Sequence, residues 1–210
     1  AAIYGILSVA AVYFAARQIT YDDRDSRWIA AIAAALLAFS FMNIVWSRYG
    51  ERVTTQPFVQ ALAIGFLFRG LRKAPPLSPP YTGGTKGGVR LDFIFAGIFI
   101  GLAAYTYISA RLFPIPITFV LLIALFVNKN KKLLITNYFL LFFFALIIFA
   151  PLGWFFIQHP ETFFVRFNQV VAKGDESDLL WRGISGALGM IFISGEPYDR
   201  YNLPLKPIFD

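Results

Sequence analysis

The chain has 210 residues, of which 58% are hydrophobic and 18% aromatic, and its mean hydropathy is +0.62. This apolar share is well above that of a soluble domain. The absence of cysteine excludes a disulfide framework, a thiolate metal site and a thiol nucleophile. The net charge of +7 comes from basic residues in short loops between apolar runs, a pattern typical of a polytopic membrane protein and not of a nucleic-acid-binding protein.

Six apolar runs follow one another along the chain, and each is long enough, or nearly so, to cross a bilayer as a helix. A span needs about 20 mostly apolar residues, with about 17 as the lower limit. The third run has 15 residues and would need local thinning of the bilayer or snorkelling arginines. We expect spans at about 1–16, 28–46, 57–71, 93–110, 112–127 and 133–152. The predicted fold is therefore all-α, a polytopic transmembrane bundle of about six spans.

Two further segments do not fit a span. Residues 73–88 are rich in Pro and Gly, which argues against any helix there and predicts a flexible linker. The apolar run Gly183–Ser194 has 12 residues, too few to cross the bilayer, and predicts an interfacial helix on the outer surface. We therefore expect a transmembrane bundle over 1–152 and an extracytoplasmic segment over 153–210.

The distribution of Lys and Arg predicts the orientation of the bundle. The connections at 17–27, 69–92 and 128–132 carry 11 of these residues. The connection at 47–56 and the turn at Arg111 carry 3. By the positive-inside rule the first group faces the cytoplasm and the second group faces outward. We expect an integral, multi-pass protein of the cell membrane whose active face is extracytoplasmic.

Three groups of polar side chains lie on the predicted outward face, and they are the candidate functional residues. Together they supply guanidinium, carboxylate, imidazole and phenol groups. Arginine keeps its charge when partly buried and binds phosphate through two parallel hydrogen bonds, so this face suits a phosphorylated lipid headgroup. The groups are Arg48, Glu51 and Arg52; Tyr105, Tyr107 and Arg111; and His159, Glu161, Arg166 and Gln169.

Each group also has a simpler interpretation. Arg48 and Arg111 stand at the ends of spans, where arginines often only fix the topology. Tyr105 and Tyr107 could belong to an interfacial aromatic belt. The sequence His-Pro-Glu that starts at His159 is also typical of the first turn of a surface helix. One histidine and no cysteine do not predict a metal site built by the protein, and a divalent metal is left open.

The order and spacing of these motifs resemble a known family. The chain is similar to the bacterial membrane glycosyltransferases of the GT-C fold that are related to dolichyl-phosphate-mannose protein mannosyltransferases, from about Val9 to Asp210. The resemblance rests on Ser47-Arg48-Tyr49-Gly50-Glu51-Arg52, on Gly97-Ile-Phe-Ile-Gly101-Leu-Ala-Ala-Tyr105-Thr-Tyr107 with Arg111 and Pro114, and on His159-Pro160-Glu161 with Arg166 and Gln169. The closing segment departs from the family pattern, because Gly195-Glu196, Arg200-Tyr201-Asn202 and Pro204-Leu205 stand where Gly-Asp, Arg-His-Asn and Pro-Gly are expected.

The resemblance implies the activity and the partners. Family members take a sugar from a polyprenyl-phosphate carrier and transfer it, with inversion, to an acceptor outside the cytoplasm. The implied partners are membrane lipid, the lipid-linked sugar donor and a protein or glycolipid acceptor. An acidic residue in the family's first outer loop is the base. Because the chain starts at Ala1 inside an apolar run, we expect an internal piece of a longer protein, with that base before Ala1.

The resemblance also implies roles for the candidate residues. The arginines would stabilise the departing lipid phosphate, whereas the uncharged polar residues would contact the sugar or the acceptor. The two glutamates would face outward, but they do not match the place of the base. The first set is Arg48, Arg52, Arg111 and Arg166, the second is Tyr105, Tyr107, His159 and Gln169, and the glutamates are Glu51 and Glu161.

Two other classes remain open on the sequence alone. A transporter or lipid flippase would use the arginines to line a path for an anionic substrate. Such a protein should carry charged or helix-breaking residues at mid-membrane depth in paired spans, and the predicted spans are nearly free of both. A scaffold subunit without catalytic activity is the third class.

Overall fold

The computed structural model describes residues 1–49, 52–73, 86–127, 131–162, 181, 185–186, 188–189 and 193. These residues form helices and connections without any strand, which confirms the all-α prediction for the described part of the chain. The elements are α1 (Ala2–Ile19), α2 (Ser26–Phe39), α3 (Phe41–Tyr49), the 3-10 helix η1 (Arg52–Thr54), α4 (Thr55–Lys73), α5 (Lys86–Thr106), the 3-10 helix η2 (Ile108–Leu112), α6 (Pro114–Val127) and α7 (Lys131–Gln158).

Within the described residues, four helical segments are long and apolar enough to cross a membrane. They are α1, residues Val89–Thr106 of α5, the joined η2–α6 segment Ile108–Val127, and α7. These segments coincide with the first, fourth, fifth and sixth predicted spans. The count of six spans and the interfacial helix over Gly183–Ser194 stay predictions, and most of the latter lies outside the described residues.

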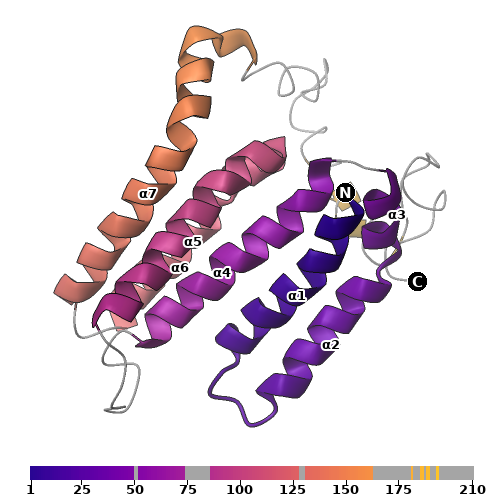
Figure 1. The fold of residues 1–210 in the computed structure, drawn as a ribbon, viewed down its shortest axis with the longest axis horizontal. Coiled ribbons are helices and arrows are strands. Elements are labelled where there is room, and N and C mark those ends of the chain that lie inside the picture. The colour runs from indigo at the N-terminus through magenta and orange to yellow at the C-terminus, as the bar shows by residue number, and fades with distance from the viewer. Residues whose placement is uncertain are drawn as a thin grey trace. The chain divides into compact units, whose positions relative to one another are not determined.

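The chain divides into two compact units, Ala1–Pro151 and Leu152–Asp210. In the first unit, α1 packs between α2 and α4, and α4 packs in turn against α5 (Figure 1). α7 covers the next face of α5, and α6 contributes Ile117 and Leu121 to the shared core. That core also holds Leu67 of α4, Phe93 of α5 and Leu141 of α7, so four helices bury their apolar side chains together.

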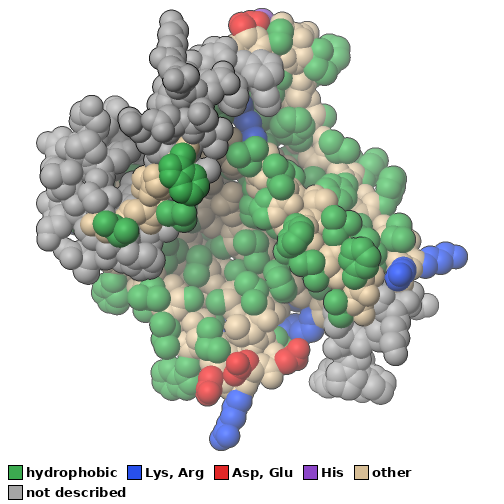
Figure 2. Space-filling view, turned by 180° about the vertical axis from the view of Figure 1, so that it is seen from behind, with side chains coloured by type: hydrophobic (Ala, Val, Ile, Leu, Met, Phe, Trp, Pro, Cys, Tyr) green, Lys and Arg blue, Asp and Glu red, His purple; other side chains and the backbone are tan. Residues whose placement is uncertain are grey.

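Many large apolar side chains of the first unit are nevertheless exposed. Phe126 of α6 is 85% exposed, and Phe139 and Leu146 of α7 are 69% and 64% exposed. Figure 2 shows hydrophobic side chains over much of the visible surface. Exposed apolar patches of this extent mark a surface that is covered by another apolar phase, and for these helices a lipid bilayer is the phase that fits.

The packing of α5 against α7 depends on two glycines four residues apart. Gly97 lies against the backbone of Leu141, and a Cβ at Gly101 would lie 2.7 Å from the carbonyl oxygen of Ala145. Spacing of this kind lets membrane helices approach closely. Contacts advance in step along both helices, from Phe93 with Tyr138 onward, so α5 and α7 run parallel. Because α6 connects these two parallel helices in the sequence, the chain runs back along α6 before α7 begins. This is the arrangement expected for three successive membrane spans.

The predicted span 28–46 is not one continuous helix. α2 ends at Phe39, and Ser40 has an extended conformation with φ −61° and ψ 119°. The amide of Ile44 donates to the carbonyl of Ser40 at 3.1 Å, so Ser40 also begins α3. Serine is favoured at such a position because its short polar side chain suits the start of a helix. The break separates α2, which has 14 residues or about four turns, from the helix that carries Arg48.

The prediction that residues 73–88 contain no helix is wrong at both ends. α4 continues through Lys73, and α5 begins at Lys86, seven residues before the predicted span. The first turns of α5 are helical because Val89 and Asp92 are buried against their neighbours, at 6% and 1% exposure. Tertiary packing thus outweighs the low helix propensity of the two glycines that follow Lys86.

Candidate functional site

An apolar groove opens between α1, α2 and α3, and its volume is about 820 Å³. Its walls consist mostly of Ala, Ile and Val side chains, with Asn43, Ser47 and Arg48 of α3 at one end. Arg48 is the only charged side chain among the described residues that line it. The groove therefore joins a long apolar surface to a single guanidinium, which is a combination that suits an amphiphile with an anionic head.

Small residues create the hollow. Ala10 of α1 faces the groove opposite Ala34 and Ala38 of α2, and none of the three can fill the space between the helices. At the Arg48 end, Gly5 lies directly against the Ser47 side chain, so α3 is held against α1. The break at Ser40 changes the direction of the chain, so that α3 lies against α1. The groove results from this change of direction and from the small size of the three alanines.

The Arg48 guanidinium is exposed and has no paired side chain among the described residues. α3 itself is anchored, because the hydroxyl of Thr54 donates to the carbonyl of Trp46 at 3.1 Å and Thr54 is 2% exposed. An exposed guanidinium on an anchored helix can donate hydrogen bonds to an anion. The position of Arg48 at the end of the groove thus agrees with the charge chemistry of arginine and phosphate.

The Arg111 turn lies at the same end of the first unit as Arg48. The side chains of Gln56, at the start of α4, and Ser109, in η2, approach to 3.4 Å. Ala110 packs with Val59 and Ala103 in a small apolar cluster below the turn. Because α4 starts directly after η1, which is anchored to α3, these contacts connect the Arg111 turn to the Arg48 segment. We call this end of the unit the Arg48 end.

The two predicted tyrosines have different surroundings. The hydroxyl of Tyr105 donates to the backbone carbonyl of Ile148 at 2.8 Å, so it joins α5 to α7. This contact lies beside Pro151, which leaves the carbonyl of Ile147 without a helical donor. Tyr107 instead stands in the extended connection between α5 and η2, with φ −152° and ψ 160°, and is 49% exposed. Tyr105 is 46% exposed, so the two rings are similarly accessible, and they differ in that the hydroxyl of Tyr105 is already hydrogen-bonded to the protein.

The third predicted group belongs to the second unit, and its described part shows only local contacts. His159 Nδ1 lies 3.5 Å from a carboxylate oxygen of Glu161, and the imidazole centre lies 4.8 Å from the centre of the Phe155 ring, with the two ring planes tilted by 45°. The hydroxyl of Thr162 donates to the carbonyl of His159 at 2.7 Å. These contacts are those of a helix start. Both His159 and Glu161 are exposed, at 49% and 67% of their side chains.

Four predicted site residues lie outside the described part of the structure, either entirely or with their side chains. Glu51, Arg166 and Gln169 lie outside the described residues. Arg52 is the first residue of η1, but its side chain is not described. The structure thus brings Arg48, Tyr105, Tyr107 and Arg111 to one end of the first unit, and the other candidates stay predictions.

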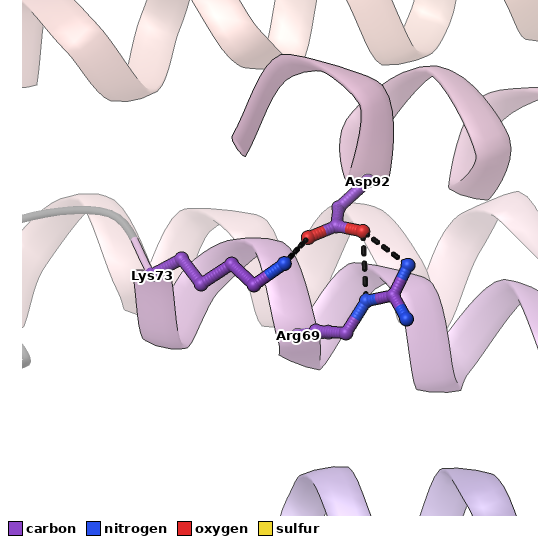
Figure 3. A network of polar contacts seen from close by, with 3 residues as sticks. All are labelled: Arg69, Lys73 and Asp92. Atoms are coloured by element: carbon purple, nitrogen blue, oxygen red, sulfur yellow. Dashed lines mark hydrogen bonds and ion pairs between the residues drawn. The ribbon is translucent and has the colours of Figure 1, made fainter. Parts of the chain in front are cut away.

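Sequence reasoning missed a buried ion cluster at the opposite end of the same unit (Figure 3). Asp92 of α5 has a side chain 2% exposed, and two cations of α4 pair with it. Arg69 Nε donates to Oδ1 at 2.7 Å, and Lys73 Nζ donates to Oδ2 at 2.9 Å. Arg69 also lies over the ring of Phe66 at 4.7 Å. The signal was present in the sequence as two cations four residues apart, which share one helix face.

A second unexpected polar group lies inside the sixth predicted span. Asn137 of α7 is fully buried, and neither its amide nitrogen nor its oxygen has a hydrogen-bond partner among the described residues. Its neighbours on the same helix face are Leu134, Tyr138 and Leu141, which belong to the apolar core. A buried amide without a hydrogen-bond partner costs free energy, so Asn137 is expected to lower the stability of the protein.

At the end of the unit that holds Asp92, which is opposite the Arg48 end, two arginines contact the connection between α1 and α2. The Arg72 guanidinium lies 3.5 Å from the centre of the Tyr21 ring, and Arg17 donates to the Ser26 hydroxyl at 3.0 Å. Burial lowers the pKa of the Arg72 guanidinium, which nevertheless keeps its charge at physiological pH. These arginines are held by aromatic and hydroxyl groups of the protein, in contrast to Arg48.

Among the described residues there is no group of three His, Asp or Glu side chains that could hold a metal ion. Comparisons of the chain with protein-family models, with curated proteins and with solved structures find no match. The resemblance to the GT-C glycosyltransferases therefore stays a prediction. The groove, the Arg48 end and the four membrane-compatible helices are the features of this chain that bear on its function.

Proposed function

We propose that the protein is a membrane glycosyltransferase that takes a sugar from a polyprenyl-phosphate carrier and transfers it to an acceptor outside the cytoplasm. The observation that carries this proposal is the apolar groove that ends at Arg48. A polyprenyl phosphate sugar has an apolar chain, one phosphate diester and a polar head. The groove supplies an apolar wall for the chain and a guanidinium at the place where the phosphate would stand.

The physical match between the carrier and the groove has two parts. The prenyl chain is already out of water in the bilayer, so its binding to the groove gains little hydrophobic free energy. The groove instead provides van der Waals contacts with the chain and fixes its orientation. The arginine contributes charge-assisted hydrogen bonds, which are about twice as strong as neutral ones. Near the edge of a bilayer the effective dielectric constant is low, which further strengthens the attraction between Arg48 and the phosphate.

The proposed reaction requires that negative charge be stabilised on the departing phosphate. The acceptor oxygen forms a bond to C1 of the sugar from the face opposite the phosphate, and the bond between C1 and the phosphate oxygen breaks. Polyprenyl phosphate leaves with both electrons of that bond, and the acceptor proton passes to a base. No residue of this chain is assigned as that base. Arg48 would stabilise the charge that grows on the phosphate, as positioned cations do in other group transfers.

Other residues at the Arg48 end have supporting roles in the proposal. Arg111 stands in η2, which is connected to the start of α4 through Gln56 and Ser109. Tyr107, four residues before Arg111, is exposed and is assigned to the sugar or the acceptor. Tyr105 is assigned a positioning role, because its hydroxyl is held by Ile148. The remaining candidates keep the roles that the family resemblance implies: Arg52 and Arg166 at the phosphate, and His159 and Gln169 at the sugar or acceptor.

The test is sugar transfer by the full-length protein in proteoliposomes that contain polyprenyl-phosphate mannose with a labelled sugar. Arg48→Ala and Arg111→Ala should each lower the rate of transfer by about 10²–10³-fold, the scale of losing one transition-state donor. Arg48→Lys and Arg111→Lys should lie between alanine and wild type, because lysine keeps the charge and loses the planar fork.

The matched control is Arg24→Ala. Arg24 is exposed in the connection between α1 and α2, at the end opposite Arg48, and its loss should leave the rate within about twofold. Thermal stability of each variant should be measured beside the rate, since Arg111 has contacts of its own. Wild-type rates in both Arg48→Ala and Arg111→Ala would refute the phosphate roles, and absence of any sugar transfer by the wild-type protein would refute the proposal.

One observation favours a second candidate, a transporter or flippase of an anionic lipid. The break at Ser40 interrupts a segment that the sequence predicts as one span, and interrupted helices are typical of transporters. The two candidates differ in a single measurement. A flippase moves a labelled polyprenyl phosphate between the leaflets of a liposome without consuming it, whereas a transferase consumes the sugar-bearing carrier only when an acceptor is present.

A further inference from the structure

The length of the groove suggests which part of the carrier the protein recognises. Along α1 the lining residues extend from Ala2 to Tyr13, and Gly5 near the first of them lies against Ser47, the residue before Arg48. At a rise of 1.5 Å per residue this distance is about 16 Å. Beyond Tyr13 the two helices close on each other, because Ala30 of α2 is fully buried and Arg17 donates to the hydroxyl of Ser26. A chain that lies in the groove must therefore leave it near Tyr13.

We infer that the groove binds only the phosphate-proximal part of the prenyl chain, over a length close to that of a farnesyl group, and does not recognise the remainder of the carrier. The inference rests on the proposed function and makes it more specific. The substrate class is a prenyl phosphate of farnesyl length or longer. A geranyl chain would leave the Tyr13 end of the groove empty, whereas a long polyprenyl chain would extend past it into the lipid.

The chemistry of the walls predicts how affinity depends on chain length. From Ile6 and Val9 to Tyr13, each additional stretch of chain gains contact with apolar side chains. The chain moves from lipid and not from water, so the gain per methylene group is the difference between close contact with the groove and looser contact with lipid. Affinity should therefore increase until the chain fills the groove and should then stay constant.

The experiment measures binding of geranyl, farnesyl, geranylgeranyl and undecaprenyl phosphates to the full-length protein in nanodiscs. Affinities are expressed per mole fraction of ligand in the bilayer. Differences in how strongly each ligand partitions from water into the bilayer then do not affect the measured affinity for the protein. Farnesyl phosphate should bind about tenfold more tightly than geranyl phosphate, a difference of about 1.4 kcal/mol. The two longer ligands should bind within about twofold of farnesyl phosphate. Farnesol, which lacks the phosphate, should bind at least about tenfold more weakly than farnesyl phosphate.

A groove-filling variant gives the internal check. Ala10 lies between Ile6 and Tyr13 in the groove and is exposed, so Ala10→Phe blocks the far part of the groove without a clash in the core. In this variant farnesyl phosphate should bind no better than geranyl phosphate. Ala35→Phe is the matched control, because Ala35 is exposed on α2 and does not line the groove. It should keep the wild-type dependence on chain length.

The possible outcomes separate this inference from the proposed function. Affinity that keeps rising to undecaprenyl phosphate, or that is equal for geranyl and farnesyl phosphates, would overturn the length inference and leave carrier binding in place. An unchanged length dependence in Ala10→Phe would overturn the assignment of the groove. If none of the four phosphates binds, the carrier-binding function itself is wrong, and the groove is then the contact site of another apolar partner such as a helix.

Discussion

Gly97 of α5 lies directly against the backbone carbonyl of Leu141 of α7, with no space for a side chain between them. One turn later Gly101 has the same relationship to Ala145, so two parallel helices are packed backbone to backbone. This contact fixes the end of α5, from which the connection with Tyr107 and Arg111 extends. The position of the Arg111 turn thus depends on glycines well outside it.

Substitution of Gly97 by Ala should destabilise the protein. A Cβ at this position collides with backbone, which cannot move away as a flexible side chain can, and overpacking of this kind costs about 1–3 kcal/mol. We expect the thermal midpoint in detergent to fall by about 5 °C. Gly189→Ala is the control, because a Cβ there would meet nothing within 4 Å. Equal midpoints for Gly97→Ala and wild type would show that the two helices are not in contact.

Removal of one member of the Asp92 cluster should cost more than removal of an exposed charge on the same helix. Arg69→Ala leaves the buried carboxylate with Lys73 alone, and Asp92→Asn leaves both cations without their partner. We expect each to lower stability by about 3 kcal/mol, and the double variant to lose clearly less than the sum. Arg90→Gln, at an exposed position of α5, should change stability by less than about 0.5 kcal/mol. Additive losses would contradict the pairing.

Replacement of Asn137 by Leu should stabilise the protein. The amide is fully buried without a partner among the described residues, so an apolar side chain of similar size removes a penalty of about 1–3 kcal/mol. Unfolding of the purified protein by heat measures the gain, and Thr136→Val at the exposed neighbouring position is the control. A lower midpoint in Asn137→Leu would mean that the amide has a partner. A higher midpoint with reduced sugar transfer would assign the residue to function.

The orientation of the first unit is tested with single cysteines, since the chain has none. Asp23 and Ser109 are exposed in the connections at opposite ends of the unit, so each cysteine should be accessible from one side only. The distribution of basic residues predicts that Ser109→Cys reacts with an impermeant thiol reagent in intact cells and that Asp23→Cys reacts only after lysis. The reverse pattern would place the Arg48 end in the cytoplasm and would contradict transfer to an outer acceptor.

The apolar runs predicted α1, α5, α6 and α7 well, because a span of about 20 apolar residues is a local property of the sequence. The break at Ser40 was not predicted. No Pro or Gly marks it, and Phe39 and Phe41 continue the apolar run on both sides. The start of α5 at Lys86 was missed for the opposite reason, because Gly and Pro near it indicated a linker while Asp92 and its partners stabilise a helix.

The candidate site was predicted in part. The sequence identified Arg48 and Arg111 from their positions at the ends of apolar runs, and the structure places both at the Arg48 end. The groove beside Arg48 could not be predicted, because it depends on where Ala34 and Ala38 face Ala10 across two antiparallel helices. Tyr105 was predicted as a substrate contact, and its hydrogen bond to Ile148 became visible only when α5 and α7 were packed together.

The most direct test of carrier binding is photo-crosslinking with a farnesyl phosphate that bears a diazirine on its chain, followed by mapping of the labelled residues by mass spectrometry. The account predicts adducts on groove residues such as Ile6, Val9 and Ala34, which unlabelled farnesyl phosphate suppresses and phosphatidylglycerol does not. Arg48→Ala should reduce their yield by about tenfold. Adducts spread over exposed residues of α7 such as Phe139 and Leu146, with no suppression by unlabelled ligand, would contradict the account.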